Sequence, residues 1–273
     1  DLALSLAARW KGAIVGADSM QVYRGMDIGT AKPTSEQRRL VPHHLIDVVE
    51  PDEPFDASRY SALARATIAQ LTRAGTPVFI VGGTGLYIRA LLGGLIDGPG
   101  ADEALRLSLK EEGRRLGIDA LYERLRLRDP QAAGRIDRRD GVRIIRALEV
   151  LELTGRSIVD HQRDHGFRQR PYETLKIGLT RERAALLAGI DARVERMIAA
   201  GFVDEVRRLL AQGYHRLLKP MQSLGYRHLA AYLAGEGDLA TAVGLIKRDT
   251  RRFAKRQMTW FRGDPEYIWN EAG

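Results

Sequence analysis

Ala13-Ile-Val-Gly-Ala-Asp18 is a short apolar run that ends at a carboxylate, a pattern that predicts a strand buried in a parallel sheet. A second run, Thr76-Pro-Val-Phe-Ile-Val81, ends at two glycines and is followed by a helical pattern. Helical patterns also precede both runs. Strands that alternate with helices favour a parallel sheet wrapped by helices, so we predict an α/β fold. The helices expected around these strands cover residues 1–10, 58–73 and 86–92.

The two predicted strands place polar residues at the same edge of the sheet. Asp18 follows the first strand, and Gly82-Gly83-Thr84 follows the second. In open parallel sheets, ligands bind at the carboxyl ends of the strands. We therefore expect a ligand site between these two strand ends.

A long helical stretch interrupts the α/β pattern. Residues 93–101 are glycine-rich and indicate a linker, whereas residues 102–166 are highly charged and contain only helical patterns. A strand pattern returns at residues 174–179, and we expect this strand to rejoin the core. We therefore predict a core formed by residues 1–101 and 167–273, with residues 102–166 as an inserted all-helical module. Further helices are expected over residues 190–200, 203–212 and 239–261.

Composition limits the classes of protein to consider. The chain has 273 residues, a net charge of +8 and no cysteine. The charge favours an anionic partner such as nucleic acid, although a basic surface without a specific partner is also compatible with it. The lack of cysteine excludes disulfides, cysteine nucleophiles and thiolate zinc sites. No stretch reaches the roughly 18 apolar residues of a membrane span, and we expect a cytoplasmic monomer with no membrane partner.

The loop from Asp18 to Pro33 carries the most chemistry. A carboxylate at a strand end, beside Ser19 and Gln21, suits a base that removes a proton from a bound group. Thr30 and Lys32 are candidates for facing an anion. The alternative is that Asp18 caps a turn and that the loop only connects two elements.

The second strand end has the geometry of a phosphate site. Gly82-Gly83-Thr84-Gly85 opens a helix, and backbone amides at a helix N-terminus bind phosphate. A glycine turn with Thr84 as the N-cap is equally compatible with the pattern. His43-His44 lack a third ligand at a useful spacing, so we prefer a structural role for them over a metal site.

Two segments near the C-terminus favour RNA. The predicted last helix carries six cations and one acid over residues 247–256, and their spacing puts the cations on one broad face. This arrangement favours phosphate contacts over a merely solvated face. Gln222-Ser-Leu-Gly-Tyr-Arg227 is expected to be a glycine turn whose tyrosine suits stacking on a base, with a packed turn as the alternative.

Several stretches occur in a fixed order along nearly the whole chain. They are Asp18-Ser19 with Tyr23-Arg-Gly-Met-Asp-Ile-Gly-Thr-Ala-Lys-Pro33, then Val81-Gly-Gly-Thr-Gly-Leu-Tyr87, Arg146-Ala-Leu-Glu149, Gly225-Tyr226-Arg227 and Lys255-Arg-Gln-Met-Thr-Trp260. In this order they resemble the tRNA dimethylallyltransferase (tRNA isopentenyltransferase) family. The resemblance implies a P-loop-type core whose helical insertion grips the anticodon stem-loop of tRNA.

The resemblance also implies an activity and a set of site residues. The reaction transfers a dimethylallyl group from dimethylallyl pyrophosphate to N6 of the adenine 3′ of the anticodon, with Mg²⁺ as cofactor and release of pyrophosphate. By this match Asp18 is the general base, Thr84 lies by the reacting centre, and Arg193 binds the pyrophosphate. The tRNA contacts that the match implies are Asp18, Ser19, Met20, Gln21, Arg106, Val142, Arg143, Ile144, Ile145, Arg146, Gln222, Ser223, Leu224, Gly225, Tyr226 and Arg227.

One departure from the family pattern concerns the N-terminus. The family has G-x-T-x-x-G-K-T before the helix that opens this chain, and the sequence lacks that motif. We therefore expect that a strand and its phosphate loop are missing, and with them the Mg²⁺ ligands.

Three other functions stay open. The first is an adenylate isopentenyltransferase that acts on free nucleotide, but a free nucleotide needs neither the helical module nor a basic last helix. The second is a P-loop small-molecule kinase in which Asp18 takes a hydroxyl proton. The third is an RNA-binding protein without activity.

Overall fold

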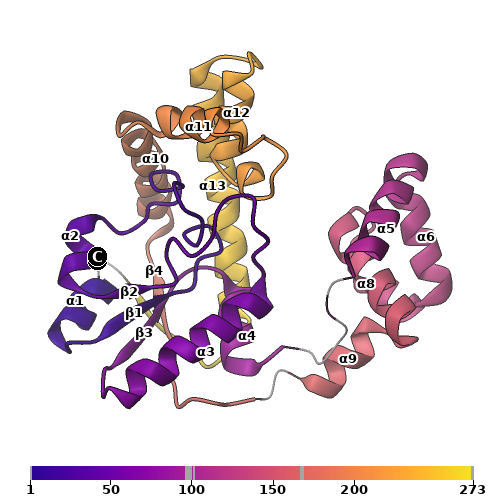
Figure 1. Ribbon diagram of the computed structural model, residues 1–273, viewed down its shortest axis with the longest axis horizontal. Coiled ribbons are helices and arrows are strands. Elements are labelled where there is room, and N and C mark those ends of the chain that lie inside the picture. Colours follow the sequence, from indigo (N-terminus) through magenta and orange to yellow (C-terminus); the bar gives the residue numbers. More distant parts are fainter. Residues whose placement is uncertain (1, 96–99, 101, 167–168, 272–273) are drawn as a thin grey trace. The chain divides into compact units, whose positions relative to one another are not determined.

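The computed structural model describes residues 2–95, 100, 102–166 and 169–271, and the chain divides into two compact units (Figure 1). The first unit combines Asp1–Leu91 with Tyr172–Gly273, and the second is Leu92–Pro171. The second unit is one continuous segment, inserted into the chain of the first. The predicted module, residues 102–166, lies within this segment.

Three parallel strands form the larger sheet of the first unit. The central strand β1 (Ala13–Gly16) pairs with β2 (His43–His44) on one side and with β3 (Val78–Val81) on the other. All four residues of β1 are buried, as expected for a strand with neighbours on both edges and helices against its faces. The predicted α/β class with parallel strands is confirmed, and the two histidines form an edge strand.

Helices pack on this sheet where the sequence predicted them. Helix α1 (Leu2–Arg9) covers the sheet face that carries Ile14, and α3 (Ala57–Arg73) contacts β1 and β3. Helix α4 (Gly85–Gly93) begins directly after β3. The sequence analysis missed the short helix α2 (Ser35–Leu40), which a capping box between Thr34 and Gln37 stabilises.

Four helices complete the first unit beside the sheet (Figure 1). Helix α10 begins earlier than predicted because the Glu182 side chain caps it by accepting a hydrogen bond from the Ala185 amide. The prediction of a glycine turn at residues 222–227 was incomplete, because Gly225, at φ +89°, leads the chain directly into a helix. The elements are α10 (Arg183–Ala199), α11 (Phe202–Ala211), the 3-10 turn η1 (Pro220–Gln222), α12 (Tyr226–Leu233) and α13 (Leu239–Arg262).

The strand that follows the second unit was partly wrong in the sequence analysis. Strand β4 (Ile177–Thr180) forms, but within the described residues it pairs with β5 (Ile268–Glu271) and not with β1, β2 or β3. The two strands are parallel and make a separate two-stranded sheet. The sequence analysis missed β5 because four residues at the end of a chain carry too little pattern to predict a strand.

The second unit is wholly helical in its described residues and has its own apolar core. Leu109, Leu121 and Leu148 are among the fully buried side chains of this core. Arg139 lies outside the helix that carries Arg143, because it precedes Asp140, the capping residue of that helix. The helices are α5 (Glu103–Leu116), α6 (Ile118–Arg128), α7 (Pro130–Ala133), α8 (Gly141–Thr154) and α9 (Ile158–His165).

None of the helices within the ranges described above combines the length and the apolar character needed to cross a membrane.

Candidate active site

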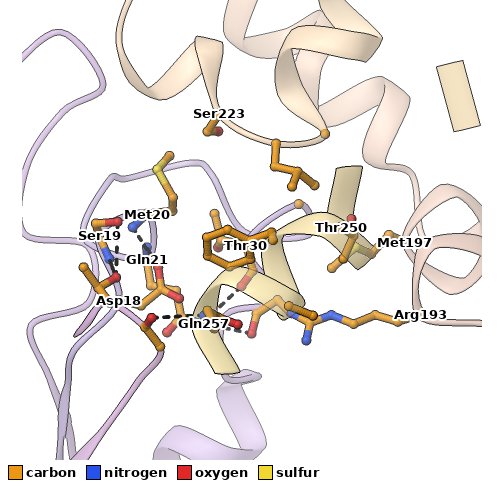
Figure 2. Close-up of a pocket in the computed structure, with 18 of the residues that line it drawn as sticks. Asp18, Ser19, Met20, Gln21, Thr30, Arg193, Met197, Ser223, Thr250 and Gln257 are labelled. Carbon is orange, nitrogen blue, oxygen red and sulfur yellow. Dashed lines mark hydrogen bonds between the residues drawn. The ribbon is translucent and has the colours of Figure 1, made fainter. Parts of the chain in front are cut away.

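A cavity of about 1210 Å³ lies in the first unit, at the carboxyl ends of β1 and β3. Its lining also includes residues of α10 and α13 and the segment Gln222–Arg227. Figure 2 shows Asp18, Ser19 and Gln21 on one side of this space and Arg193 and Thr250 on the other. Small-molecule sites usually have a volume of roughly 300–1,000 Å³, so this cavity has room for more than one reacting group.

Asp18 is oriented by its own loop and by the second strand end. Its Oδ1 atom accepts hydrogen bonds from the Met20 amide at 2.7 Å and the Gln21 amide at 3.3 Å. The hydroxyl of Thr84 accepts from the Ser19 amide at 2.9 Å and donates to the Ser19 hydroxyl at 3.3 Å. These contacts join the two predicted strand ends into one polar edge, and they leave the second carboxylate oxygen of Asp18 for a ligand.

The glycines after β3 allow a close approach of backbone and side chains. A Cβ atom on Gly82 would lie 2.2 Å from the Ala17 carbonyl oxygen, and one on Gly83 would lie 2.2 Å from the Gln257 side chain. The Gln257 amide donates a hydrogen bond to the Gly83 carbonyl oxygen at 3.0 Å. Helix α13 is therefore attached to the loop that carries Thr84. Gly82 is required by the close approach of the Ala17 backbone, whereas a side chain at Gly83 would displace the end of the Gln257 side chain.

Arg193 reaches the cavity from α10 (Figure 2). Its side chain is exposed, and neighbouring protein atoms partly shield the guanidinium from solvent. This loss of solvent lowers the pKa of Arg193, the Asp18 carboxylate opposes the shift, and Arg196 adds to it. Arginine nevertheless remains charged at neutral pH. Asp191, which lies near Arg193 on the same helix, binds Arg251.

The predicted anion contact of Lys32 with a ligand is wrong. Its side chain is only 2% exposed, and its ammonium group donates to the Tyr23 carbonyl and to the carboxylates of Asp27 and Asp47. Asp27 lies in the same loop, but Asp47 is 15 residues away, and no local pattern of the sequence reveals that contact. Thr30 does line the cavity, although its hydroxyl already donates to the Met26 carbonyl at 2.7 Å.

The segment Gln222–Arg227 lines the cavity, but its side chains are not equivalent. Tyr226 is buried and packs edge-on against Phe202, so its ring is not free to stack on a base as expected. Arg227 is exposed and donates to Asp249 at 2.6 Å. The hydroxyl of Ser223 is buried and has no hydrogen-bond partner in the described part of the chain, so it is available to a ligand.

Acids of neighbouring segments occupy part of the basic face of α13. Lys247 binds Glu195, and Arg251 binds Asp191, with both acids on α10. Arg256 lines the cavity. Fewer cations of this helix are therefore available to an RNA than its own composition indicated.

The second unit holds the other predicted tRNA contacts. Arg106 and Arg146 both bind the fully buried carboxylate of Glu149, at 2.8 and 2.6 Å. Burial acts to raise the pKa of Glu149, but hydrogen bonds from Arg146, the Asp102 amide and Arg106 outweigh it and hold that pKa below its usual range. The side chains of Val142 and Arg143 are exposed, and Ile145 is partly buried.

Ile144 corrects the expected set of contacts. Its side chain is 0% exposed and packs in the apolar core of the second unit. A residue with no exposed surface cannot touch RNA while the unit is folded, so Ile144 is removed from the expected contacts.

Two buried acids of the first unit were not predicted from the sequence as functional residues. Glu205 lies on the same face of α11 as the buried residues Phe202, Val206 and Leu209, and a carboxylate at such a position is a signal that could have been noticed. Asp249 was noted only as the one acid of a basic stretch. Hydrogen bonds from Arg248, Arg227 and His228 hold the pKa of Asp249 well below its usual range despite its burial.

Comparisons with known proteins agree on one family. A model described as IPP transferase matches residues 21–264. The chain is 57% identical over 271 residues to tRNA dimethylallyltransferase 2 of Syntrophus aciditrophicus, a match that covers 99% of this chain and 87% of that protein.

Solved structures give the same result. The full-length tRNA isopentenylpyrophosphate transferase of Bacillus halodurans is similar with a TM-score of 0.71 and 40% identity, over 98% of this chain and 84% of that one. A eukaryotic dimethylallyltransferase acting on tRNA shares the fold, with a TM-score of 0.78 and 23% identity over 99% and 70% of the two chains. The chain therefore belongs to the tRNA dimethylallyltransferase family.

Proposed function

We propose that this protein transfers a dimethylallyl group from dimethylallyl pyrophosphate to N6 of the adenine 3′ of the anticodon in tRNA and releases pyrophosphate. The observation that carries the proposal is one cavity lined by a carboxylate, Asp18, and by a guanidinium, Arg193, from opposite sides. Family membership supports the same reaction, since the relatives named above are transferases of this kind.

In the proposed reaction Asp18 is the base. The exocyclic amine of adenine is a weak nucleophile because its lone pair is delocalised into the ring. The free oxygen of Asp18 accepts a hydrogen bond from that amine and takes its proton as the new C–N bond forms. Thr84 holds the Ser19 amide at 2.9 Å, which keeps the loop that carries Asp18 in place during the transfer.

Arg193 is proposed to bind the leaving pyrophosphate. Negative charge develops on the leaving group, and a positioned guanidinium stabilises it by charge-assisted hydrogen bonds. Its partial removal from water strengthens this interaction, because the local dielectric is lower than in bulk solvent.

Mg²⁺ is proposed as the cofactor that neutralises pyrophosphate charge when bound. Two acids line the cavity, Asp18 and Asp249, and Asp249 is already surrounded by arginines. A lining with so few free carboxylates suits an ion held largely by the phosphates of a substrate, which is common for Mg²⁺. We assign no further protein ligand to the ion.

The second unit is proposed to bind the anticodon stem-loop. Exposed Arg139 and Arg143, together with the paired Arg106 and Arg146, give it cations for phosphate contacts. The remaining proposed contacts of the tRNA in the first unit are Asp18, Ser19, Met20, Gln21, Gln222, Ser223, Leu224, Gly225, Tyr226 and Arg227. Of these, Tyr226 is buried, so its ring does not stack on a base.

Mass spectrometry of tRNA tests the proposal. The protein is incubated with unmodified tRNA, dimethylallyl pyrophosphate and Mg²⁺, and the tRNA is then digested to nucleosides. One dimethylallyl group should appear on the adenosine 3′ of the anticodon. Modification of free AMP in preference to tRNA would support the adenylate transferase instead, and transfer of label from ATP would support a kinase.

A further inference from the structure

Glu205 is a buried carboxylate with an unusual set of partners. Its side chain belongs to a residue that is 1% exposed, on α11, and it does not line the cavity. Oε2 accepts hydrogen bonds from the amides of Asp27 at 3.0 Å and Ile28 at 2.7 Å. Oε1 accepts from the Gly29 amide at 3.1 Å and from the Tyr226 hydroxyl at 2.6 Å. Within the described residues it has no ion pair, so these four donors alone satisfy the buried charge.

Three of the donors belong to the loop that positions Gln21. The carbonyl oxygens of Thr30 and Ala31, directly after the amides that Glu205 binds, accept hydrogen bonds from the Gln21 side chain at 3.1 and 3.2 Å. The backbone N–H of Gln21 donates to Oδ1 of Asp18 at 3.3 Å. Glu205 is therefore connected through a short series of hydrogen bonds to the side of the cavity that carries the proposed base.

The fourth donor, the Tyr226 hydroxyl, belongs to a second segment of the cavity lining that is far from residues 27–29 in the sequence. Tyr226 is the first residue of α12, and its backbone follows the lining segment that contains Ser223 and Gly225. Burial and the Glu205 carboxylate both raise the pKa of Tyr226, so its hydroxyl keeps its proton and remains a donor. One carboxylate thus joins two segments that are far apart in the chain and that both line the cavity.

The side chains and backbone around this connection are closely packed. The rings of Phe202 and Tyr226 meet edge-on with centroids 4.9 Å apart. A Cβ atom on Gly29 would lie 2.2 Å from the Phe202 ring, and one on Gly225 would lie 2.8 Å from the same ring. The spacing between the two segments is therefore fixed both by close contact and by hydrogen bonds.

We propose that Glu205 is a positioning residue that sets the spacing between the Gln21 side and the Tyr226 side of the cavity, and so the orientation of the substrate base toward Asp18. The inference rests on the proposed function, because it assumes that a base enters between these two segments. Glu205 itself touches no substrate. Arg193 has no part in this set of hydrogen bonds, so pyrophosphate binding should not depend on Glu205.

The test compares Glu205→Gln with Asp204→Asn, which removes an exposed carboxylate from the neighbouring position of the same helix. A glutamine has one acceptor oxygen, and its amide group would face donors that the carboxylate now satisfies. We expect the single-turnover rate constant for tRNA modification to fall about tenfold in Glu205→Gln. The reaction amplitude and the KM for dimethylallyl pyrophosphate, measured at saturating tRNA, should stay within about twofold of wild type, and Asp204→Asn should match wild type.

The split between rate and amplitude distinguishes positioning from loss of folded protein. A reduced amplitude with an unchanged rate constant would mean that Glu205 only stabilises the fold, and an unchanged rate and amplitude would also overturn the proposal.

Hydrogen exchange gives a readout that needs no activity. Residues 26–31 should exchange faster in Glu205→Gln than in wild type or Asp204→Asn, with β1 and β3 unaffected. Unchanged exchange at residues 26–31 would reject the connection itself. If wild type fails to modify tRNA while exchange at residues 26–31 still responds, the proposed function is at fault and not the connection.

Discussion

At the scale of single residues, Asp18 is held through one oxygen and is open at the other. Its Oδ1 accepts from two backbone amides, and an asparagine can keep these bonds while losing the negative charge. We expect Asp18→Asn to lower the single-turnover rate constant about 10²–10⁴-fold, because the proton of the attacking amine then has no base.

Binding of tRNA should change much less in this variant, as measured by filter binding. Asp52→Asn, which removes an exposed acid outside the cavity lining, is the matched control and should behave as wild type. An Asp18→Asn protein that modifies tRNA at the wild-type rate would remove Asp18 from the mechanism.

Arg193 and Arg196 form a natural pair for comparison on α10. Both carry a positive charge, but only Arg193 lines the cavity. We expect Arg193→Ala to raise the KM for dimethylallyl pyrophosphate about tenfold, through loss of a charge-assisted contact. Arg196→Ala should leave steady-state kinetics near wild type. Equal effects of the two substitutions would show that net charge on the helix matters and that a specific contact does not.

Prediction from sequence succeeded where the position of a residue depends on local pattern. Asp18 and Thr84 follow predicted strands, so topology alone brings them to one edge. It failed for residues whose role depends on distant partners. Lys32 was predicted to face an anion, but it forms an ion pair with Asp47. Tyr226 was predicted to be free for stacking, but Glu205 and Phe202 bury it.

Among the elements of the second unit, α8 has two exposed cations near its N-terminal end: Arg143 lies in its first turn, and Arg139 precedes its capping residue Asp140. Replacing both by glutamine should weaken tRNA binding. It should also reduce the slope of log affinity against log salt concentration by about 1.5, because fewer counterions are released when two phosphate contacts are lost. The control neutralises Arg114 and Arg115, two exposed arginines at the end of α5 in the same unit. If both double variants lower the salt dependence equally, the binding depends only on overall charge.

The length of an element decided how well the sequence pattern predicted it. Long helices with a clear apolar stripe, such as α3 and α13, were predicted to within about two residues. Among the shorter elements, α2 and β5 were missed and β4 was assigned the wrong partner. Strand β4 was predicted, but its pairing with β5 depends on a segment about 90 residues later, and no local property of either strand specifies that register.

At the scale of the whole molecule, the two units have separate cores. Replacing Leu92–Pro171 by a Gly-Ser linker should leave the first unit folded, because the residues that line its cavity all lie outside that segment. We expect the shortened protein to keep its thermal unfolding transition and to lose activity on tRNA by more than about 100-fold. A shortened protein that modifies tRNA at the parent rate would reject a role of the second unit in RNA binding.

The continuity of the second unit also bears on how such a protein can change over generations. Roughly 80 consecutive codons encode a segment with its own apolar core, entered once and left once. One recombination event could therefore exchange the entire segment without altering a codon for Asp18, Thr84 or Arg193. If the second unit binds the RNA as proposed, substrate range and reaction chemistry are free to diverge at different rates, and a library of chimaeras with crossovers at these two junctions would change the RNA target while the chemistry is inherited intact.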